Sequence, residues 1–288
     1  MTMSNVLELI TIVVPVKNEE RNLPECLENV KAFRHVVIVD SGSTDRTLEI
    51  ADEFGREVVQ FKWNGEFPKK RNWLLRNYKF QTPWVMFLDA DERITSTFCE
   101  ELEAFLKSNA AAECDVISCV YDNWFADKLL RHGDAMRKTA IVRVGAAEYE
   151  KIEEDHWSDL DMEIHEHIQP RRSGAVHEIS ARLEHHDKRS LESHWQKHIK
   201  YADWEVGRYR QLVQHPERWE ALTSRQKKKY SNITKWWLAP AYFIVCYFLK
   251  RGFLDGMSGL RFALFKMRYF RLIRSKLRAR MTCGQNLP

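Results

Sequence analysis

Short apolar runs alternate with segments of helical periodicity over the first 107 residues. Runs rich in β-branched and aromatic residues predict strands at Thr11–Val16, Val36–Val39, Val58–Phe61 and Trp84–Leu88. Apolar residues three and four positions apart predict helices at Asn22–Phe33, Ser43–Phe54, Lys69–Tyr78 and Thr97–Lys107. Ser43 or Thr44 is expected to cap the second helix, and Thr97 the fourth. Strands that alternate with helices at these lengths predict an α/β fold whose parallel sheet is covered on both faces.

The second half of the chain is patterned more loosely. Val116–Val120 and Thr139–Val144 are predicted strands, and the polar segment Glu148–Arg172 is predicted to form loops around a site. Leu191–Val213 has the spacing of one long helix. The apolar run Trp236–Leu249 is too short to cross a bilayer as one helix. We therefore predict a catalytic domain over residues 1–217, with halves 1–115 and 116–217, and a C-terminal amphipathic helical extension over 218–288.

The net charge of +4 is distributed unevenly along the chain. Residues 250–281 contain ten Lys and Arg against one acid, which gives +9, so the remainder carries −5. Aromatic residues interleave with these cations, and three interpretations are open: an interfacial helix on an anionic membrane, packing against the acidic body, or nucleic-acid binding. The adjacent apolar run favours the membrane, through residues 236–281, and we expect no nucleic acid as a partner.

Cysteine usage and the first residues indicate the compartment. Six scattered cysteines without a C-x-x-C pair predict reduced thiols and not a disulfide framework. The opening segment has no basic stretch or cleavage site of the kind found in a signal peptide. We expect a cytoplasmic protein that associates peripherally with the inner face of the cell membrane.

Two polar segments follow predicted strands. Asp89 and Asp91 are spaced to point to one side after the fourth strand, where carboxylates suit Mg²⁺ or Mn²⁺; the alternative is a solvated acidic turn. The segment Asp40–Asp45 can hold a nucleotide at a helix start, or it can be an ordinary turn capped by Ser43. No G-x-G-x-x-G or P-loop motif is present.

Four motifs in order make the pattern specific: Ile12-Val13-Val14-Pro15 with Lys17-Asn18-Glu19-Glu20, the Asp40–Asp45 turn, Lys69-Lys70-Arg71-Asn72, and Asp89-Ala90-Asp91. This set resembles the inverting family 2 glycosyltransferases with the GT-A fold. Downstream, Met162-Glu163-Ile164-His165-Glu166, Leu183-Glu184-His185 and Phe253-Leu254-Asp255-Gly256 resemble a bacterial branch. That branch includes lipopolysaccharide-core and exopolysaccharide glycosyltransferases.

The resemblance implies a role for each matching residue. Pro15, Glu19 and Asp40 would line the nucleobase pocket, while Lys70 and Asn72 would approach the nucleotide. Asp89 would face the ribose and diphosphate and contribute to the metal site, and Asp91 would hold the Mg²⁺ or Mn²⁺ needed for catalysis.

Two His-Glu pairs, His165-Glu166 and His177-Glu178, could each supply the general base. The spacing of the residues does not decide between Glu166 and Glu178. We favour Glu166 as the base because it matches the downstream His-Glu motif of the family. His194 and His198 lie one helical turn apart without an H-E-x-x-H motif, which disfavours a zinc hydrolase. The segment Gln214–Trp219 is one residue too long for the Q-x-x-R-W motif of processive synthases, so single-sugar transfer is expected.

The sequence therefore predicts a metal-dependent, inverting hexosyltransferase. It would move one sugar from a nucleotide-sugar donor, a UDP-hexose, to a lipid-linked or lipopolysaccharide-core saccharide. The alternative is a non-catalytic, membrane-anchored protein that binds nucleotide sugars.

Overall fold

The computed structural model describes residues 6–125, 128–133, 136–152, 154, 157–163, 166–172, 175–186 and 191–282. Contacts divide the chain into two compact units. The first comprises residues 1–127, 135–153 and 161–188, and the second comprises residues 128–134, 154–160 and 189–288. The domain division suggested by the sequence, 1–217 and 218–288, stays a prediction.

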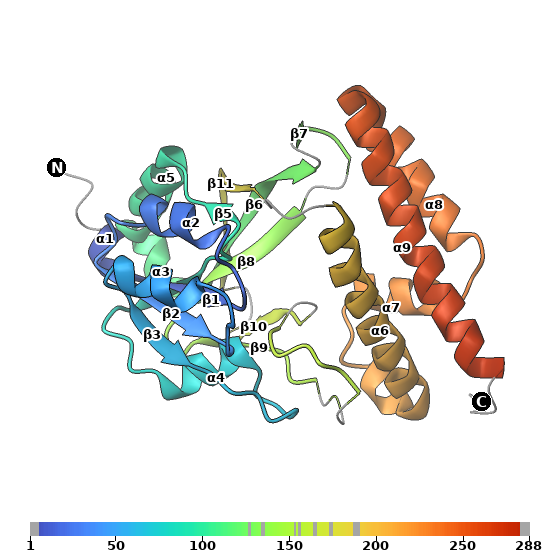
Figure 1. The fold of residues 1–288 in the computed structure, drawn as a ribbon, viewed down its shortest axis with the longest axis horizontal. Helices are drawn as coiled ribbons and strands as arrows, with labels where there is room; N and C mark the ends of the chain where they lie inside the picture. The colour runs from blue at the N-terminus through green and yellow to red at the C-terminus, as the bar shows by residue number, and fades with distance from the viewer. Residues whose placement is uncertain are drawn as a thin grey trace. The chain divides into compact units, whose positions relative to one another are not determined.

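The first unit is built on a twisted sheet whose strands follow the order β3-β2-β1-β4-β8-β6-β11-β5 (Figure 1). Four of the seven neighbouring pairs are parallel, and β8 runs antiparallel to both of its neighbours. The strands are β1 (Ile10–Val16), β2 (His35–Asp40), β3 (Glu57–Gln60), β4 (Trp84–Phe87), β5 (Glu92–Arg93), β6 (Val116–Phe125), β8 (Met136–Arg143) and β11 (Val176–His185).

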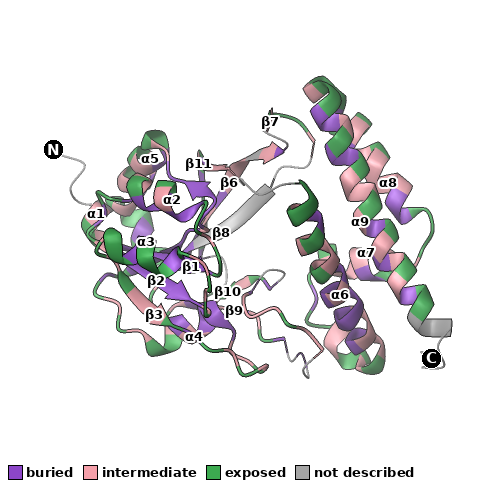
Figure 2. Cartoon of the chain, viewed as in Figure 1, coloured by how far each residue is buried: buried purple, intermediate pink, exposed green. Residues whose placement is uncertain are grey.

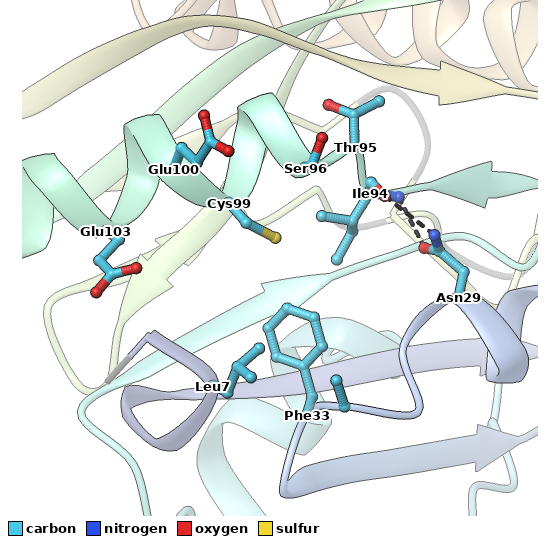
Figure 3. A pocket seen from close by; sticks show the side chains of 10 residues that line it. Leu7, Asn29, Phe33, Ile94, Thr95, Ser96, Cys99, Glu100 and Glu103 are labelled. Carbon is cyan, nitrogen blue, oxygen red and sulfur yellow. Dashed lines mark hydrogen bonds between the residues drawn. The ribbon is translucent and has the colours of Figure 1, made fainter. Parts of the chain in front are cut away.

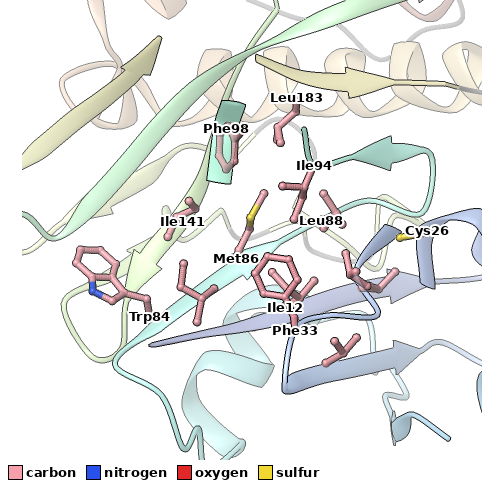
Figure 4. Close-up of a cluster of buried hydrophobic side chains, with 14 of the residues drawn as sticks. Ile12, Cys26, Phe33, Trp84, Met86, Leu88, Ile94, Phe98, Ile141 and Leu183 are labelled. Carbon is pink, nitrogen blue, oxygen red and sulfur yellow. The ribbon is translucent and has the colours of Figure 1, made fainter. Parts of the chain in front are cut away.

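Helices cover both faces of this sheet. They are α1 (Val6–Leu9), α2 (Leu23–Asn29), α3 (Thr47–Glu53), α4 (Lys70–Asn77), α5 (Ser96–Leu106) and the 3₁₀ helix η1 (Asn109–Glu113). On one face, Ile12 and Val14 of β1 pack with buried side chains of α2, α3 and α5, and Figure 4 shows part of this cluster. On the other face, Val13 packs with Phe87 of β4 and Leu74 of α4. The predicted α/β fold, with a mostly parallel sheet between helices, is confirmed.

Two predicted helix caps are wrong. The second helix begins at Thr47 and not at Ser43, because Asp45 accepts hydrogen bonds from the backbone N–H of Thr47 (3.0 Å) and from its hydroxyl (2.5 Å), which keeps the preceding residues in a turn. In α5 the cap is Thr95, whose hydroxyl accepts from the backbone N–H of Phe98 at 3.2 Å.

The segment predicted as loops, Glu148–Arg172, contains more regular structure than its sequence indicated. Strands β9 (Ala147–Tyr149) and β10 (Ile168–Pro170) form a separate antiparallel pair. Ala147 and Tyr149 are buried beneath the sheet with α4. This pair holds together Tyr149 and Ile168, the residues that flank the acidic segment.

The second unit is helical. Besides the short strand β7 (Lys128–Leu130), it comprises α6 (Leu191–Gln214), η2 (Pro216–Trp219), α7 (Ser224–Asn232), α8 (Leu238–Ile244), η3 (Val245–Leu249), η4 (Gly252–Asp255) and α9 (Gly256–Thr282). Its core joins Val206 of α6, Tyr230 of α7 and Leu238 of α8 to Phe270 and Ile273 of α9. The predicted helical C-terminal extension is confirmed.

Part of the basic, aromatic tail is internal. Buried positions alternate with exposed ones along α9 (Figure 2). Phe262 and Phe270 are among the buried residues, and Lys276 pairs with Asp203 of α6 at 2.7 Å. Packing of the tail against the rest of the chain therefore accounts for some of its charge and aromatic content, although α6 itself carries four Lys and Arg against three acids. Within the described ranges, no helix combines the length and apolarity that crossing a bilayer requires.

We expect His198 of α6 to make stability depend on pH. Burial lowers its pKa to about 3 among Phe265, Tyr269 and His194, so the folded state keeps it neutral. The unfolded chain takes up this proton below pH 6.5 and the folded one does not, so stability rises with pH. Between pH 7 and pH 5, the free energy of unfolding should fall by about 2 kcal/mol through this group. Urea titrations should show that decrease in the wild type and lack it in His198→Phe; equal decreases would contradict the assignment.

Candidate active site

The turn after β2 is organised by Asp40. Its carboxylate is fully buried and accepts hydrogen bonds from the backbone N–H of Gly42 (3.0 Å) and Ser43 (3.1 Å) and from the Ser43 hydroxyl (2.5 Å). Gly42 has φ +76°, a conformation that glycine adopts at least cost. Asp40 therefore shapes the turn at the carboxyl end of β2, and its second oxygen also accepts from the Ser43 N–H at 3.2 Å.

The segment after β1 is joined to the same turn. The side-chain oxygen of Asn18 accepts from the backbone N–H of Thr44 at 2.8 Å, and the backbone N–H of Glu19 donates to the Thr47 hydroxyl at 2.9 Å. Pro15 is buried in β1, in register with the residue before Asp40. Pro15, Glu19 and Asp40 thus lie at or just after the carboxyl ends of two paired strands, and their common nucleobase pocket stays a prediction.

The two aspartates after β4 have different surroundings. Asp89 is partly exposed, and its Oδ1 accepts a hydrogen bond from Nη2 of Arg71 at 2.7 Å. Asp91 is buried, and its Oδ2 lies 3.5 Å from Nε2 of His185 at the end of β11. Asp89 is thus paired with a cation, while Asp91 faces an imidazole.

Asp91 and His185 fit a divalent metal. Carboxylate oxygen and imidazole nitrogen are both metal ligands, and a metal that binds a diphosphate keeps several positions for phosphate and water. No cluster of three or more His, Cys, Asp or Glu side chains that could hold a metal occurs among the described residues. Asp89, the other predicted metal ligand, is engaged by Arg71 at 2.7 Å, and its place at a metal stays a prediction. His185 belongs to the Leu183-Glu184-His185 motif, but nothing in its sequence context marks it as a metal ligand.

The start of α4 gathers buried cations. Lys70 is buried, and its Nζ donates to the Val16 carbonyl at 3.2 Å and lies 3.6 Å from Oδ2 of Asp161. Burial lowers the pKa of Lys70, and Asp161 opposes part of that shift. Asn72 is engaged on both sides of its amide by the backbone of Tyr149, at 2.9 and 3.0 Å. Its side chain thus holds β9 in place, and its contact with a nucleotide stays a prediction.

Glu163 caps this helix from 92 positions away. Its two carboxylate oxygens accept from the backbone N–H groups of Arg71 and Asn72, each at 2.9 Å, while its carbonyl accepts from Nη1 of Arg71 at 2.8 Å. Burial raises the pKa of Glu163, and the hydrogen bonds from Asn72 and Arg71 oppose that shift. A carboxylate at a helix N-terminus stabilises the helix dipole. No role was assigned to Glu163 from sequence, since no local signal marks a cap supplied by a distant segment.

Glu163→Gln should destabilise the protein. The amide NH₂ would face a backbone N–H, which leaves a buried donor unsatisfied at a cost of about 1–3 kcal/mol. The matched control is Glu148→Gln, which loses a pair between Glu148 and Arg76 at the other end of α4, where both side chains are partly exposed and about 0–1 kcal/mol is expected. Urea unfolding measures both changes, and equal effects would argue against the capping role.

The two candidate bases differ in their surroundings. Glu166 is buried, and its Oε1 lies 2.8 Å from Nζ of Lys69, directly before α4; His165 lies outside the described residues. Glu178 is exposed in β11, seven residues before His185, which corresponds to roughly 20 Å of extended strand. His177 stacks on Phe105 at 3.8 Å and so serves packing. The contacts gather Glu166, and not Glu178, around the start of α4.

A cavity of about 200 Å³ lies apart from these residues (Figure 3). Leu7, Phe33, Ile94 and Cys99 contribute to its lining, and none of the predicted site residues does. The predicted site residues therefore lie outside this cavity.

Comparison with known proteins places the chain in a family. The sequence pattern described as "Glycosyl transferase family 2" matches residues 11–173, more than half of the chain. An uncharacterized glycosyltransferase of Rickettsia conorii is 31% identical over 103 residues, which cover 35% of this chain and 36% of that protein. A 4,4'-diaponeurosporenoate glycosyltransferase of Staphylococcus haemolyticus is 30% identical over 113 residues, covering 35% and 28%.

These similarities are partial. The chain spans about a third or less of the length of the curated relatives that it matches. Among solved structures, glucosyl-3-phosphoglycerate synthase of Mycobacterium tuberculosis, in complex with Mn²⁺, UDP-glucose and phosphoglyceric acid, is 21% identical with a TM-score of 0.34, over 42% of this chain and 48% of that one. Because the family pattern covers β1 through β10 and the sheet has the predicted arrangement, the chain belongs to glycosyl transferase family 2 and has the GT-A fold.

Proposed function

We propose that this glycosyltransferase moves one sugar from a UDP-hexose to a lipid-linked or lipopolysaccharide-core saccharide, with inversion and with a divalent metal. The observation that carries the proposal is the meeting of three pairs around the start of α4 and the end of β4: Asp91 with His185, Asp89 with Arg71, and Glu166 with Lys69. Fixed cations, a metal-binding pair and a buried carboxylate are the groups that transfer from a sugar diphosphate needs.

The donor would lie along the carboxyl ends of β1, β2 and β4. We assign Pro15, Glu19 and Asp40 to the nucleobase end, where the turn after β2 is already rigid. Lys70 and Arg71 supply positive charge for the diphosphate, with Asp89 orienting Arg71 and Asn72 fixing the helix start. A metal held by Asp91 and His185 would act as a Lewis acid toward the leaving diphosphate. The imidazole ligand favours Mn²⁺ over Mg²⁺, which prefers oxygen ligands.

Inversion requires one displacement at the anomeric carbon. The acceptor oxygen forms a bond to that carbon while the bond to the diphosphate oxygen breaks, and the leaving group takes the electron pair. The acceptor proton passes to the carboxylate of Glu166, which Lys69 holds in place. A non-catalytic protein that binds nucleotide sugars would not need a buried, oriented carboxylate. Membership of the family does not favour this alternative either.

The acceptor places the enzyme at a membrane. We propose peripheral association with the cytoplasmic face of the cell membrane through residues 236–281, supported by the basic charge of this segment and by its exposed apolar side chains.

A donor screen tests the function. Nucleoside diphosphate release should appear with a UDP-hexose, a membrane extract as acceptor and Mn²⁺ or Mg²⁺, and should vanish with a chelator. Pyrophosphate as the product would indicate nucleotidyl transfer, and donor binding without turnover of any nucleotide sugar would support the binding-protein alternative.

A further inference from the structure

Exposed apolar side chains concentrate where α8 turns back into α9. Of thirteen exposed large hydrophobic residues in the described part of the chain, six lie within residues 244–257, which we name the hairpin tip. They are Ile244, Phe248, Leu249, Phe253, Leu254 and Met257. Leu249 is 73% exposed and Met257 61%, whereas side chains of this size are ordinarily scattered singly over a surface.

The hairpin tip is tightly built. Gly252 and Gly259 let its two arms approach closely, because a side chain at Gly259 would collide with the carbonyl oxygen of Gly252. A side chain at Gly252 would in turn meet the Cys246 carbonyl at 2.6 Å. These close backbone contacts hold the tip in one conformation, in which its apolar side chains are exposed.

Residues 131–133 form hydrogen bonds with the tip and bury the carboxylate of its acidic residue. Asp255 is the one acidic residue between positions 221 and 282, and its carboxylate accepts from the backbone N–H groups of Arg131 (3.1 Å) and His132 (2.8 Å). The His132 ring lies 3.1 Å from the same carboxylate, and the Gly133 N–H donates to the Lys250 carbonyl at 2.9 Å. Because the Asp255 side chain is only 7% exposed, the outward charges of the tip are the cations Lys250 and Arg251.

We propose that the hairpin tip is the membrane-penetrating element and that it inserts between the lipids of an anionic bilayer. The inference rests on the proposed membrane association and sharpens it. Apolar side chains at an apex, cations beside them and no exposed acid within the described residues 244–257 complement a surface of acyl chains beneath anionic headgroups. The buried aromatic residues of α9 belong to the core of the helical unit and do not reach lipid. The 236–281 segment would thus act through residues 244–257, within its first half.

Arg251 supports the assignment. It has φ +57°, which costs a non-glycine residue energy that glycine would not pay. Arg251→Gly should therefore leave thermal stability unchanged or higher while lowering affinity for anionic vesicles about fivefold, the effect of one cation near such a surface. A variant that keeps its stability and loses binding separates a lipid contact from a structural role.

The main test is vesicle co-sedimentation of the full chain, with phosphatidylcholine alone and with added phosphatidylglycerol. Leu249→Ser and Leu254→Ser should each weaken binding to both vesicle types by about tenfold. Leu191→Ser is the matched control, since Leu191 is 49% exposed in the same unit but outside the hairpin tip. Thermal melting confirms that each variant is folded.

Three results would overturn the proposal: wild-type chain that ignores anionic vesicles, tip variants that bind as the wild type does, or a concentration-dependent dimer that the tip variants dissolve without any vesicle binding. The last result would make the tip a self-association surface. Nucleoside diphosphate release in detergent, with detergent-dispersed acceptor, is scored separately. Tip variants should retain it, so loss of membrane insertion and absence of transferase activity are distinguishable.

Discussion

Asp91→Asn should lower kcat/KM for sugar transfer by about a thousandfold, which corresponds to the several kcal/mol that a metal contributes to a leaving diphosphate. The amide keeps the size of the side chain but removes the charge that faces His185 at 3.5 Å. Nucleoside diphosphate release measured over a range of Mn²⁺ concentrations gives both the rate and the metal dependence. Calorimetry of Mn²⁺ binding in the presence of UDP should show the same loss of affinity.

Two neighbours serve as comparisons for this variant. His185→Gln should reproduce both losses, because it removes the partner ligand. Glu184→Gln changes the adjacent residue, whose carboxylate pairs with His186 at 2.9 Å, and should leave activity close to that of the wild type. Wild-type Mn²⁺ dependence in Asp91→Asn would remove Asp91 from the metal site.

Glu166→Gln should lower kcat by about 10²–10⁴-fold, the range for loss of a general base, with little change in donor affinity. Glu178→Gln is the control at the other candidate base, and its activity should remain close to that of the wild type. Steady-state kinetics of both variants, with UDP affinity measured separately, check these expectations. If Glu178→Gln proves the slower enzyme, the assignment of the two carboxylates is reversed.

Because Lys69 pairs with Glu166, variants of both residues can separate the effect of Glu166 on catalysis from its effect on stability. Lys69→Met alone should destabilise the protein by about 3–5 kcal/mol, because it leaves the Glu166 carboxylate buried without its cation. Combining Lys69→Met with Glu166→Gln removes both charges and should restore much of that stability but none of the activity. Recovered activity in the double variant would show that Glu166 acts only through the fold.

The order of elements was predictable where a strand is buried on both faces. β1 and β4 are continuous apolar runs, so their sequence alone marks them as central strands. β11 carries exposed residues such as Val176 and Glu178 among its few buried positions, and its apolar signal is too sparse to predict a ten-residue strand. Its pairing with β5 places His185 opposite Glu92 and so brings it to Asp91 from 94 positions away, which no local pattern indicates.

The site was predictable to a similar extent. Motif order identified the carboxylates at the strand ends, but not their partners. Arg71 lies within a motif that was recognised, yet its pairing with Asp89 depends on how α4 lies against the sheet. No local spacing identifies Glu163 as a helix cap, because the backbone N–H groups that donate to it are 91 and 92 residues earlier in the chain. Long-range polar contacts of this kind depend on tertiary packing and cannot be predicted from the residues next to them in sequence.

The distant cap on α4 has a consequence for the order of events during synthesis. A helix of eight residues is too short to persist alone, and the acid that satisfies its first amides is 92 residues further along the chain. At a translation rate of 5–20 residues per second, Glu163 is made about 5–20 seconds after Arg71. Until it emerges from the ribosome, Lys70 and Arg71 lack the frame that holds them at the proposed donor site. The nascent strands can assemble early, but the site becomes competent only late in translation.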